Sequence, residues 1–255
     1  MNRGRYLDID WPALPPGVGT ISTLRSGGVS RGPYAALDGS GGFNLGTHVQ
    51  DDPAAVAANR ALLRQDLPAE PAWLNQVHGS RVADAAGIAP GATVDADASV
   101  AAGPGAVCII QTADCLPVLF SDVQGRVVGA AHAGWRGLSG GVLENTLARM
   151  RDAGAGEIVA WLGPAIGPGA FEVGEDVRAA FRAAHAEADA AFRPIAGTGG
   201  KFLADIYALA RLRLRHAGVA NVSGGGWCTV TEASRFYSYR RDRVTGRMAS
   251  LIWLK

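Results

Sequence analysis

The sequence has little of the material that marks disulfide-rich, membrane or nucleic-acid-binding proteins. Three cysteines in 255 residues cannot form a disulfide framework. No stretch approaches the ~18 apolar residues of a membrane span, and the first ten residues contain no continuous apolar segment of the kind found in signal peptides. A net charge of +1, with 18% charged residues, leaves no basic surface for nucleic acid. We therefore expect a cytoplasmic protein that binds a small molecule and neither nucleic acid nor a membrane.

The residues that are abundant favour many short elements in one folded unit. Hydrophobic residues make up 48% of the chain, enough for a large core, while 35 glycines and 13 prolines divide it into short segments. Mixed α and β domains of this length are common. We expect a single domain over residues 1–255.

Apolar patterns predict strands that alternate with helices. Asp51-Asp52-Pro53 has the features of a helix start, and apolar residues continue at helical spacing to Leu67, which places Arg60 on a helix. Ser139 is predicted to cap a further helix that ends at Gly154. The remaining predicted helices cover 175–187 and 203–216, and the predicted strands cover 107–111, 117–120, 127–132, 157–162, 221–225 and 249–254. Runs of paired strands separated by helices favour the α+β class.

His78, Cys115 and His132 are the leading candidates for metal ligands. Each lies in a segment that reads as a turn or the end of a strand, among small and polar residues. Two imidazoles and a thiolate suit zinc or copper, and three protein ligands leave the fourth tetrahedral position free, as in catalytic sites. Their separations of 37 and 17 residues match no zinc finger and no His-Glu-x-x-His pattern, so spacing alone adds little support. Taken singly, each residue also reads as an ordinary polar or core side chain.

The other cysteines and histidines carry weaker signals. Cys108 lies between Val and Ile and is expected in the core, whereas Cys228 follows a tryptophan beside a glycine run and is only a reserve ligand. His48 reads equally as a proton carrier and as a residue that bonds its own loop. His185 and His216 fall in alanine- and arginine-rich helices and are expected to face solvent.

Several motifs together resemble the YfiH family, whose members carry the labels polyphenol oxidase and laccase domain. The most specific are Thr112-Ala113-Asp114-Cys115 and the segment from Ala130 to Arg136, Ala-Ala-His-Ala-Gly-Trp-Arg. The further matching segments are 28–34, 162–168, 171–174 and 239–242, so the resemblance covers nearly the whole chain. One departure is Tyr237, where many members carry a second phenylalanine.

The resemblance implies a mixed-sheet α+β sandwich with flanking helices, like the catalytic domain of cytotoxic necrotising factors. It implies that His78, Cys115 and His132 bind zinc. The implied enzyme is a purine nucleoside phosphorylase that acts on adenosine, inosine and methylthioadenosine with phosphate and also deaminates adenosine. For these reactions we expect Asp114 to shuttle protons, and the remaining expected contacts are Arg60 for phosphate and Asn44 and His48 on the sugar side.

Three alternatives stay open at this stage. A metal-independent hydrolase would use Cys115 as nucleophile, with His132 or His78 as base. A copper-dependent polyphenol oxidase is disfavoured, because multicopper oxidases use about ten histidines, many in His-x-His pairs, and this chain has five and no such pair. A copper- or zinc-binding protein without turnover is the third.

Overall fold

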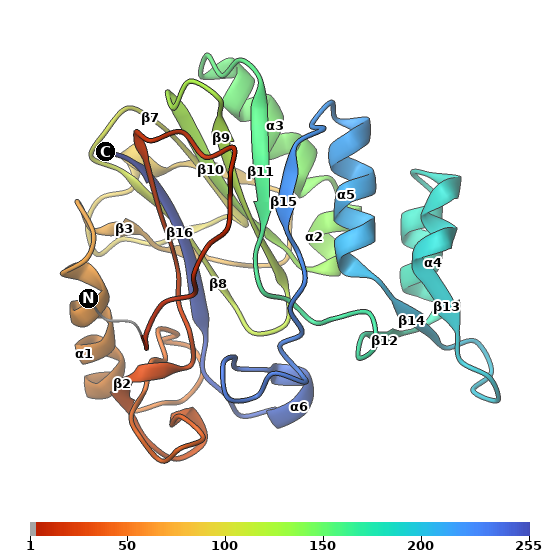
Figure 1. Ribbon diagram of the computed structural model, residues 1–255, viewed down its shortest axis with the longest axis horizontal. Helices are drawn as coiled ribbons and strands as arrows, with labels where there is room; N and C mark the ends of the chain where they lie inside the picture. Colours follow the sequence, from red (N-terminus) through yellow and green to blue (C-terminus); the bar gives the residue numbers. More distant parts are fainter. Residues whose placement is uncertain (1–3) are drawn as a thin grey trace.

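Two mixed β-sheets packed face to face form the centre of the computed structural model, which describes residues 4–255 (Figure 1). This arrangement confirms the predicted α+β class. Within these residues the smaller sheet has the order β1 (Val18–Ser22), β16 (Met248–Leu254), β8 (Val107–Thr112) and β3 (Pro71–Ala72). The larger sheet has the order β15 (Val222–Gly224), β11 (Ile158–Leu162), β9 (Leu116–Asp122), β10 (Val127–Ala133), β7 (Ala98–Ala102) and β5 (Val82–Asp84).

Side chains that alternate along each strand divide the core into layers, because successive residues of a strand point to opposite faces. On β8, Cys108 and Ile110 pack between the two sheets, whereas Val107 and Ile109 pack on the outer face beneath helix α1 (Pro53–Arg64). On β9, Leu119 faces the smaller sheet. The alternate residues Leu116, Val118 and Phe120 face the helices of the other layer.

Helices cover the outer faces of both sheets, with α1 on one side and α3 and α5 on the other (Figure 1). A small sheet of short strands and a two-stranded pair complete the architecture. The helices beside the larger sheet are α2 (Trp135–Ser139), α3 (Val142–Asp152), α4 (Glu175–Arg182) and α5 (Ile206–His216), and α6 (Tyr239–Asp242) lies near the C-terminus. The short strands are β2 (Ser26–Ser30), β4 (Leu74–Asn75), β6 (Val94–Asp95), β12 (Glu172–Val173), β13 (Phe192–Pro194) and β14 (Phe202–Ala204).

The predicted cap at Ser139 is wrong. Ser139 is the last residue of α2, and Gly141, which has a positive φ of 91°, precedes the first residue of α3. Two adjacent glycines make this break inexpensive, because glycine adopts a left-handed backbone without steric cost. The predicted helix is therefore α3, which begins after Gly141, and α2 is a separate short helix that was not predicted.

Three other predicted helices have different ends. Helix α1 stops at Arg64 rather than Leu67, and α5 begins at Ile206, because the residues just before it form strand β14. The helix predicted over 175–187 ends at Arg182. It is followed by the 3₁₀ helix η3 (Ala186–Ala191).

Helix α4, η3 and the small sheet of β12, β14 and β13 extend to one side of the body (Figure 1). We call this part, residues 171–204, the lobe. Phe181, Phe192 and Phe202 of the lobe are buried and belong to the same core cluster as the outer face of the larger sheet. In the part of the chain that the structure describes, no helix is both long and apolar enough to cross a membrane.

Candidate metal centre

His78, Cys115 and His132 come together although they are far apart in the sequence. Their donor atoms all lie within 4.8 Å of one another. The Sγ atom of Cys115 lies 3.9 Å from Nε2 of His78, and the two imidazole rings meet edge to face with centroids 4.8 Å apart. His132 is buried, Cys115 is half-buried and His78 is exposed, so the cluster opens to solvent beside His78. We call these three residues the trio.

Strand pairing places two members of the trio side by side. Cys115 occupies the turn between β8 and β9, and His132 is the penultimate residue of β10. In the antiparallel ladder His132 pairs with Pro117, and the next residue of β10 pairs with Leu116. Residues paired across such a ladder lie only about 5 Å apart. The register of β9 and β10 therefore brings the thiol to the imidazole.

Asp114 fixes the turn that carries Cys115. Its φ of 93° is unusual for a residue other than glycine. One carboxylate oxygen accepts a hydrogen bond of 2.6 Å from the Thr229 hydroxyl, and the other accepts one of 2.6 Å from the Arg240 backbone N–H. With both oxygens engaged, Asp114 braces the turn, and this geometry does not support the expected role of proton shuttle.

Asp97 is the functional residue that sequence reasoning missed. Its buried carboxylate accepts a hydrogen bond of 2.8 Å from Nδ1 of His132 and further bonds from the backbone N–H groups of Val77, His78 and Gly79. One carboxylate thus orients the ring of one donor and holds the loop of another. The only sequence signal was an acid between two alanines at the start of a strand.

Charge coupling inside the cluster favours a thiolate and an imidazolium. Burial raises the pKa of the Cys115 thiol, but the charge and hydrogen bonding of His132, assisted by His78, outweigh burial and lower the pKa to about 6. Burial lowers the pKa of His132, yet Cys115 and Asp97 together raise it to about 9. Thiolates, not thiols, are the form that binds metals and attacks electrophiles.

Gly134 leaves the space that an ion at the trio needs. A Cβ atom at this position would lie 3.0 Å from Sγ of Cys115 and 3.2 Å from Cδ2 of His78. Because Asp97 engages Nδ1 of His132, the Nε2 atom of that ring is left for a ligand. Two nitrogen donors and one sulfur donor around a cradle without a side chain fit zinc or copper with one open coordination position.

Two cavities meet at the trio. The larger, of about 410 Å³, and the smaller, of about 270 Å³, both have His78, Cys115 and Tyr239 in their walls. The wall of the larger cavity includes the polar side chains of His48, Gln111, Thr112 and Arg247. The smaller is more apolar and includes Trp135, Ile166, Phe171 and Ile206, with Arg136 and Arg240 at its edge.

The expected substrate residues differ in how they relate to these cavities. His48 lines the larger one, where burial and the charges of Arg247 and Arg60 lower the pKa of its ring. Asn44 is fully buried and bonds Asp51 and the backbone of Arg247, so it has no exposed surface for a sugar. These hydrogen bonds give Asn44 a structural role, since they hold the chain that carries Arg247.

Arg60 lies behind the cavity wall. Its Nε donates a hydrogen bond of 2.9 Å to the Leu45 carbonyl, and its guanidinium stacks on the Trp73 ring, 3.6 Å from the centroid. Burial lowers the pKa of Arg60 to about 10, although Glu70 opposes this effect. Sequence reasoning missed Arg247, the arginine that reaches the cavity.

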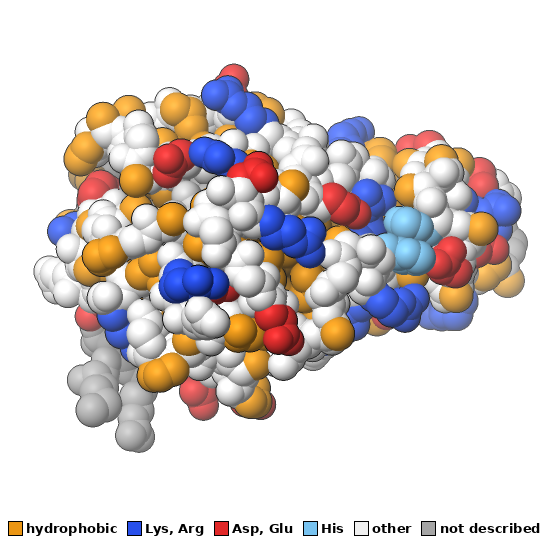
Figure 2. Space-filling model, turned by 90° about the horizontal axis from the view of Figure 1, so that it is seen from above, with side chains coloured by type: hydrophobic (Ala, Val, Ile, Leu, Met, Phe, Trp, Pro, Cys, Tyr) orange, Lys and Arg blue, Asp and Glu red, His pale blue; other side chains and the backbone are white. Residues whose placement is uncertain are grey.

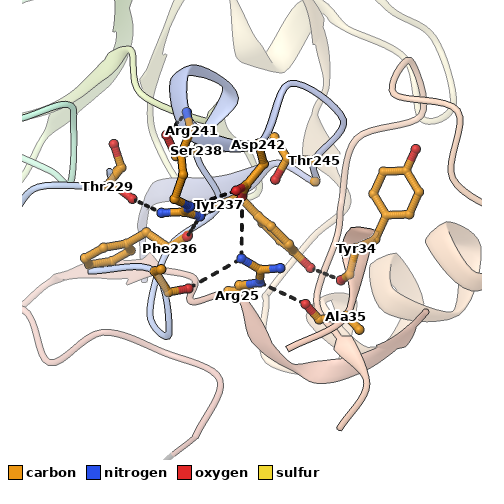
Figure 3. A network of polar contacts seen from close by, with 12 residues as sticks. Arg25, Tyr34, Ala35, Thr229, Phe236, Tyr237, Ser238, Arg241, Asp242 and Thr245 are labelled. Carbon is orange, nitrogen blue, oxygen red and sulfur yellow. Dashed lines mark hydrogen bonds and ion pairs between the residues drawn. The ribbon is translucent and has the colours of Figure 1, made fainter. Parts of the chain in front are cut away.

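A polar network around Arg25 and Arg241 holds the C-terminal segment (Figure 3). The same segment contains Tyr239 and Arg247, which line the larger cavity. Arg241 pairs with Asp242 at 2.7 Å and donates to the Thr229 carbonyl, also at 2.7 Å. Arg25 bridges this turn to the Ala35 carbonyl. Tyr237 stands where many family members carry a phenylalanine. Its hydroxyl, which phenylalanine lacks, donates a hydrogen bond of 2.5 Å to the Tyr34 carbonyl.

The other two cysteines lie outside the trio. Cys108 is fully buried, as predicted, and burial raises its pKa to about 12. Cys228, the reserve ligand, borders a separate cavity of about 630 Å³ with Trp227 and Arg211. Its Sγ accepts a hydrogen bond from the Gly167 backbone.

The fold and the trio together define a class: a mixed-sheet α+β protein with a three-donor centre open to two cavities. Residues 19–255 match the family model described as multi-copper polyphenol oxidoreductase laccase. The chain therefore belongs to this laccase-domain family, which includes the YfiH proteins.

Similar proteins support the same membership over nearly the whole chain. A purine nucleoside phosphorylase of Pseudomonas aeruginosa is 55% identical, with 98% of each chain covered. The purine nucleoside phosphorylase YfiH of Escherichia coli is 53% identical, with 96% of each covered. A crystal structure of a Neisseria meningitidis protein superposes with a TM-score of 0.90 at 52% identity, covering 98% of this chain and 99% of that one.

Proposed function

We propose that the chain is a zinc-dependent purine nucleoside phosphorylase that acts on adenosine, inosine and methylthioadenosine, with adenosine deaminase as a second activity. Relatives of this name, more than 50% identical over nearly their whole length, support the enzyme class. The observation that carries the proposal is an open three-donor centre beside a cavity lined by the half-buried guanidinium of Arg247, which no carboxylate of the described residues neutralises. Three free cysteines within the described residues are consistent with a cytoplasmic location, which we propose as well.

In this proposal, phosphate binds in the larger cavity. Arg247 lines it, and its side-chain hydrogen bonds go to the carbonyls of Thr245 and Gly246. Among residues 4–255 no carboxylate forms a salt bridge with Arg247, and burial lowers the pKa of its guanidinium. A half-buried cation without a charged partner loses part of its hydration uncompensated, and an anion such as phosphate offsets that cost. Arg60, behind the wall, adds positive charge to the same region.

The purine base of the nucleoside binds in the smaller cavity. Trp135, Phe171 and Ile206 offer aromatic and aliphatic surface on which a purine can stack. With the base there and phosphate at Arg247, C1′ of the ribose lies near the trio. A phosphate oxygen bonds to C1′, the C1′–N9 bond breaks, and its electron pair leaves with the purine, which takes up a proton.

His78, Cys115 and His132 would hold the ion, and a bound zinc would supply a Lewis acid at the junction of the two cavities. Asp97 keeps the His132 ring and the His78 loop in place for this purpose. For deamination, His48 is a better proton acceptor than Asp114, because its lowered pKa keeps the ring neutral near pH 7.

A crossed kinetic experiment tests the proposal. Arg247→Met should raise KM for phosphate by about 10- to 100-fold and leave KM for the nucleoside nearly unchanged, since a charged hydrogen bond is lost. Trp135→Ala should raise KM for the nucleoside and leave KM for phosphate nearly unchanged. His78→Ala should abolish release of free base. Arg149→Met, an exposed arginine of α3, is the control and should match the parent.

The assay follows free base by mass detection, with and without phosphate, on protein of measured metal content. A parent protein that releases no base from any of the three nucleosides would contradict the proposal, as would undiminished turnover in folded His78→Ala. Zinc and copper are separated by elemental analysis of the native protein.

One observation favours a second candidate, a metal-independent cysteine hydrolase. Cys115, His132 and Asp97 form a thiolate, imidazolium and carboxylate series like that of cysteine hydrolases. This candidate predicts that protein stripped by a chelator stays fully active and is then inactivated by iodoacetamide. The zinc proposal predicts loss of activity at the chelator step and recovery when zinc is restored.

A further inference from the structure

A second group of metal-ligand side chains lies outside the trio, where the lobe meets α5. His185 precedes η3, Glu187 lies within it, and His216 is the last residue of α5. Their donor atoms all lie within 4.8 Å of one another. Figure 2 shows histidine side chains gathered in one surface patch with acidic side chains beside it. Nothing in the proposed reaction uses these residues.

The backbone of this cluster is fixed while its side chains are free to adjust. Ala188, next to Glu187, is 2% exposed and packs into the core. The His185 N–H donates to the Phe181 carbonyl, and the Ala188 N–H donates to the His185 carbonyl. By contrast, the side chains of His216 and Glu187 are 42% and 52% exposed. The helices η3 and α5 therefore have a fixed backbone, while the metal-ligand side chains that they carry can adjust.

We propose that His185, Glu187 and His216 form a second site, for a divalent transition metal ion such as Zn²⁺, Ni²⁺ or Cu²⁺. Two imidazoles and one carboxylate are a donor set that occurs in zinc enzymes, and water would complete the coordination. Zinc bonds of ~2.0–2.1 Å in a tetrahedron separate neighbouring donors by about 3.3 Å. The Nε2 atom of His216 and Oε1 of Glu187 are now 2.6 Å apart, so an ion would replace their shared proton and move them slightly outward.

The two imidazoles must rearrange when the ion binds. Their rings are stacked, with centroids 4.1 Å apart and planes only 14° from parallel. Nearly parallel rings cannot direct nitrogen lone pairs at one point, so one ring has to turn out of the stack. The torsion between Cβ and an imidazole ring is broad, which makes that turn inexpensive. A site that requires this step binds more weakly than the trio, whose donors already surround a cradle.

The site would join η3 to α5 and thereby tie the lobe to the body. An ion that binds only the folded chain raises its stability in proportion to the logarithm of ion concentration over Kd. We therefore expect micromolar to millimolar additions of Zn²⁺ to raise the melting temperature further after the trio is saturated.

Calorimetric titration of untagged, chelator-stripped full-length protein with Zn²⁺ tests the inference. The expected result is two classes of site. His216→Gln and Glu187→Gln should each weaken the second class by more than about tenfold, since each removes a donor. The tight class and the release of free base should remain as in the parent, because neither residue borders the two cavities. Arg215→Gln, an exposed neighbour on α5, is the matched control and should retain both classes.

Copper EPR on the triple variant His78→Ala, Cys115→Ala, His132→Ala, which lacks every donor of the trio, supplies a second measurement. It should show nitrogen coupling from two imidazoles, and His185→Gln should reduce this to one. A parent that binds only one equivalent would overturn the inference and leave His216 and Glu187 as an ion pair only. A second class that survives in both His216→Gln and Glu187→Gln would overturn it too. Neither result depends on nucleoside turnover, so the inference and the proposed function fail separately.

Discussion

Asp97 organises the candidate metal centre without being one of its three donors. The same carboxylate fixes the His132 ring and receives three backbone N–H groups from the loop that carries His78. Groups that hold metal-binding histidines in this way tune both the orientation and the basicity of the ring. We therefore expect the affinity of the trio for an ion to depend partly on Asp97, which is not itself a ligand.

Asp97→Asn should lower the affinity of the centre for zinc by about 10- to 100-fold. The amide has the same shape, but its NH₂ group would face N–H donors, so at least one backbone group loses its acceptor. Competition with a chromophoric chelator measures the affinity, and near-UV circular dichroism checks the fold. Asp95→Asn, whose carboxylate is exposed and bonds only the Asn75 side chain among the described residues, is the control. Equal zinc affinity in folded Asp97→Asn would contradict this account.

At the scale of single residues, sequence predicted the trio and missed its supports. Cysteine and histidine are scarce in this chain, so their occurrence in small-residue motifs was informative. Asp97 is one of 23 acidic residues and Arg247 one of 24 basic ones, and nothing local distinguishes them from surface charges. Their importance comes from burial and partners, which only the tertiary structure supplies.

Helix α1 is held to the rest of the protein by Asn59, whose side chain is fully buried. Its Oδ1 accepts a hydrogen bond from the Val29 N–H, and its Nδ2 lies within bonding distance of the Ser30 hydroxyl and the carbonyls of Gly42 and Asn44. One amide thus links the helix to β2 and to the segment before His48.

Asn59→Ala should lower the free energy of unfolding by about 2–4 kcal/mol, because several buried polar groups lose their partner at once. Urea denaturation followed by circular dichroism measures the change. Ala58→Asn makes the reverse change at an exposed position of the same helix and should cost less than about 0.7 kcal/mol, the difference in helix propensity. Equal costs for the two variants would show that the buried network contributes nothing.

At the scale of elements, the apolar strands were predictable and the interruptions were not. Strands β8, β9 and β10 are buried along their whole length, and most of their residues are apolar. The break between α2 and α3 depends on how Gly140 and Gly141 turn the chain. The 3₁₀ helix η3 follows α4 because Ala188 packs into the core at that point, which no periodicity in the sequence reveals.

Strand β16 connects distant parts of the molecule. It pairs with β1 on one side and β8 on the other, and Arg247 precedes it directly. Its Leu251 packs toward α1, while Ile252 packs between the sheets. Because one strand contributes to two core layers, we expect the predicted domain to lose its structure as one unit.

Urea transitions should therefore coincide when followed by far-UV circular dichroism and by tryptophan fluorescence. Trp161 lies between the sheets, Trp253 lies beneath α1 and Trp135 packs beside the helices, so the fluorescence samples all three core clusters. Coincident curves are the signature of two-state unfolding. Loss of the lobe at lower urea concentration, detected by proteolysis within 171–204, would instead divide the chain into two units.

The origins of the three donors bear on how the centre assembles in time. Cys115 and His132 meet as soon as β9 and β10 pair, which is a local event along the chain. His78 joins only when Asp97, which holds the His78 loop and lies at the entrance to β7, reaches His132 across a sequence separation of 35 residues. Pairings that are close in sequence form sooner than distant ones. A cobalt ion added during refolding would first bind two ligands and later three. The change in its absorption would therefore report when the loop that carries His78 reaches the centre.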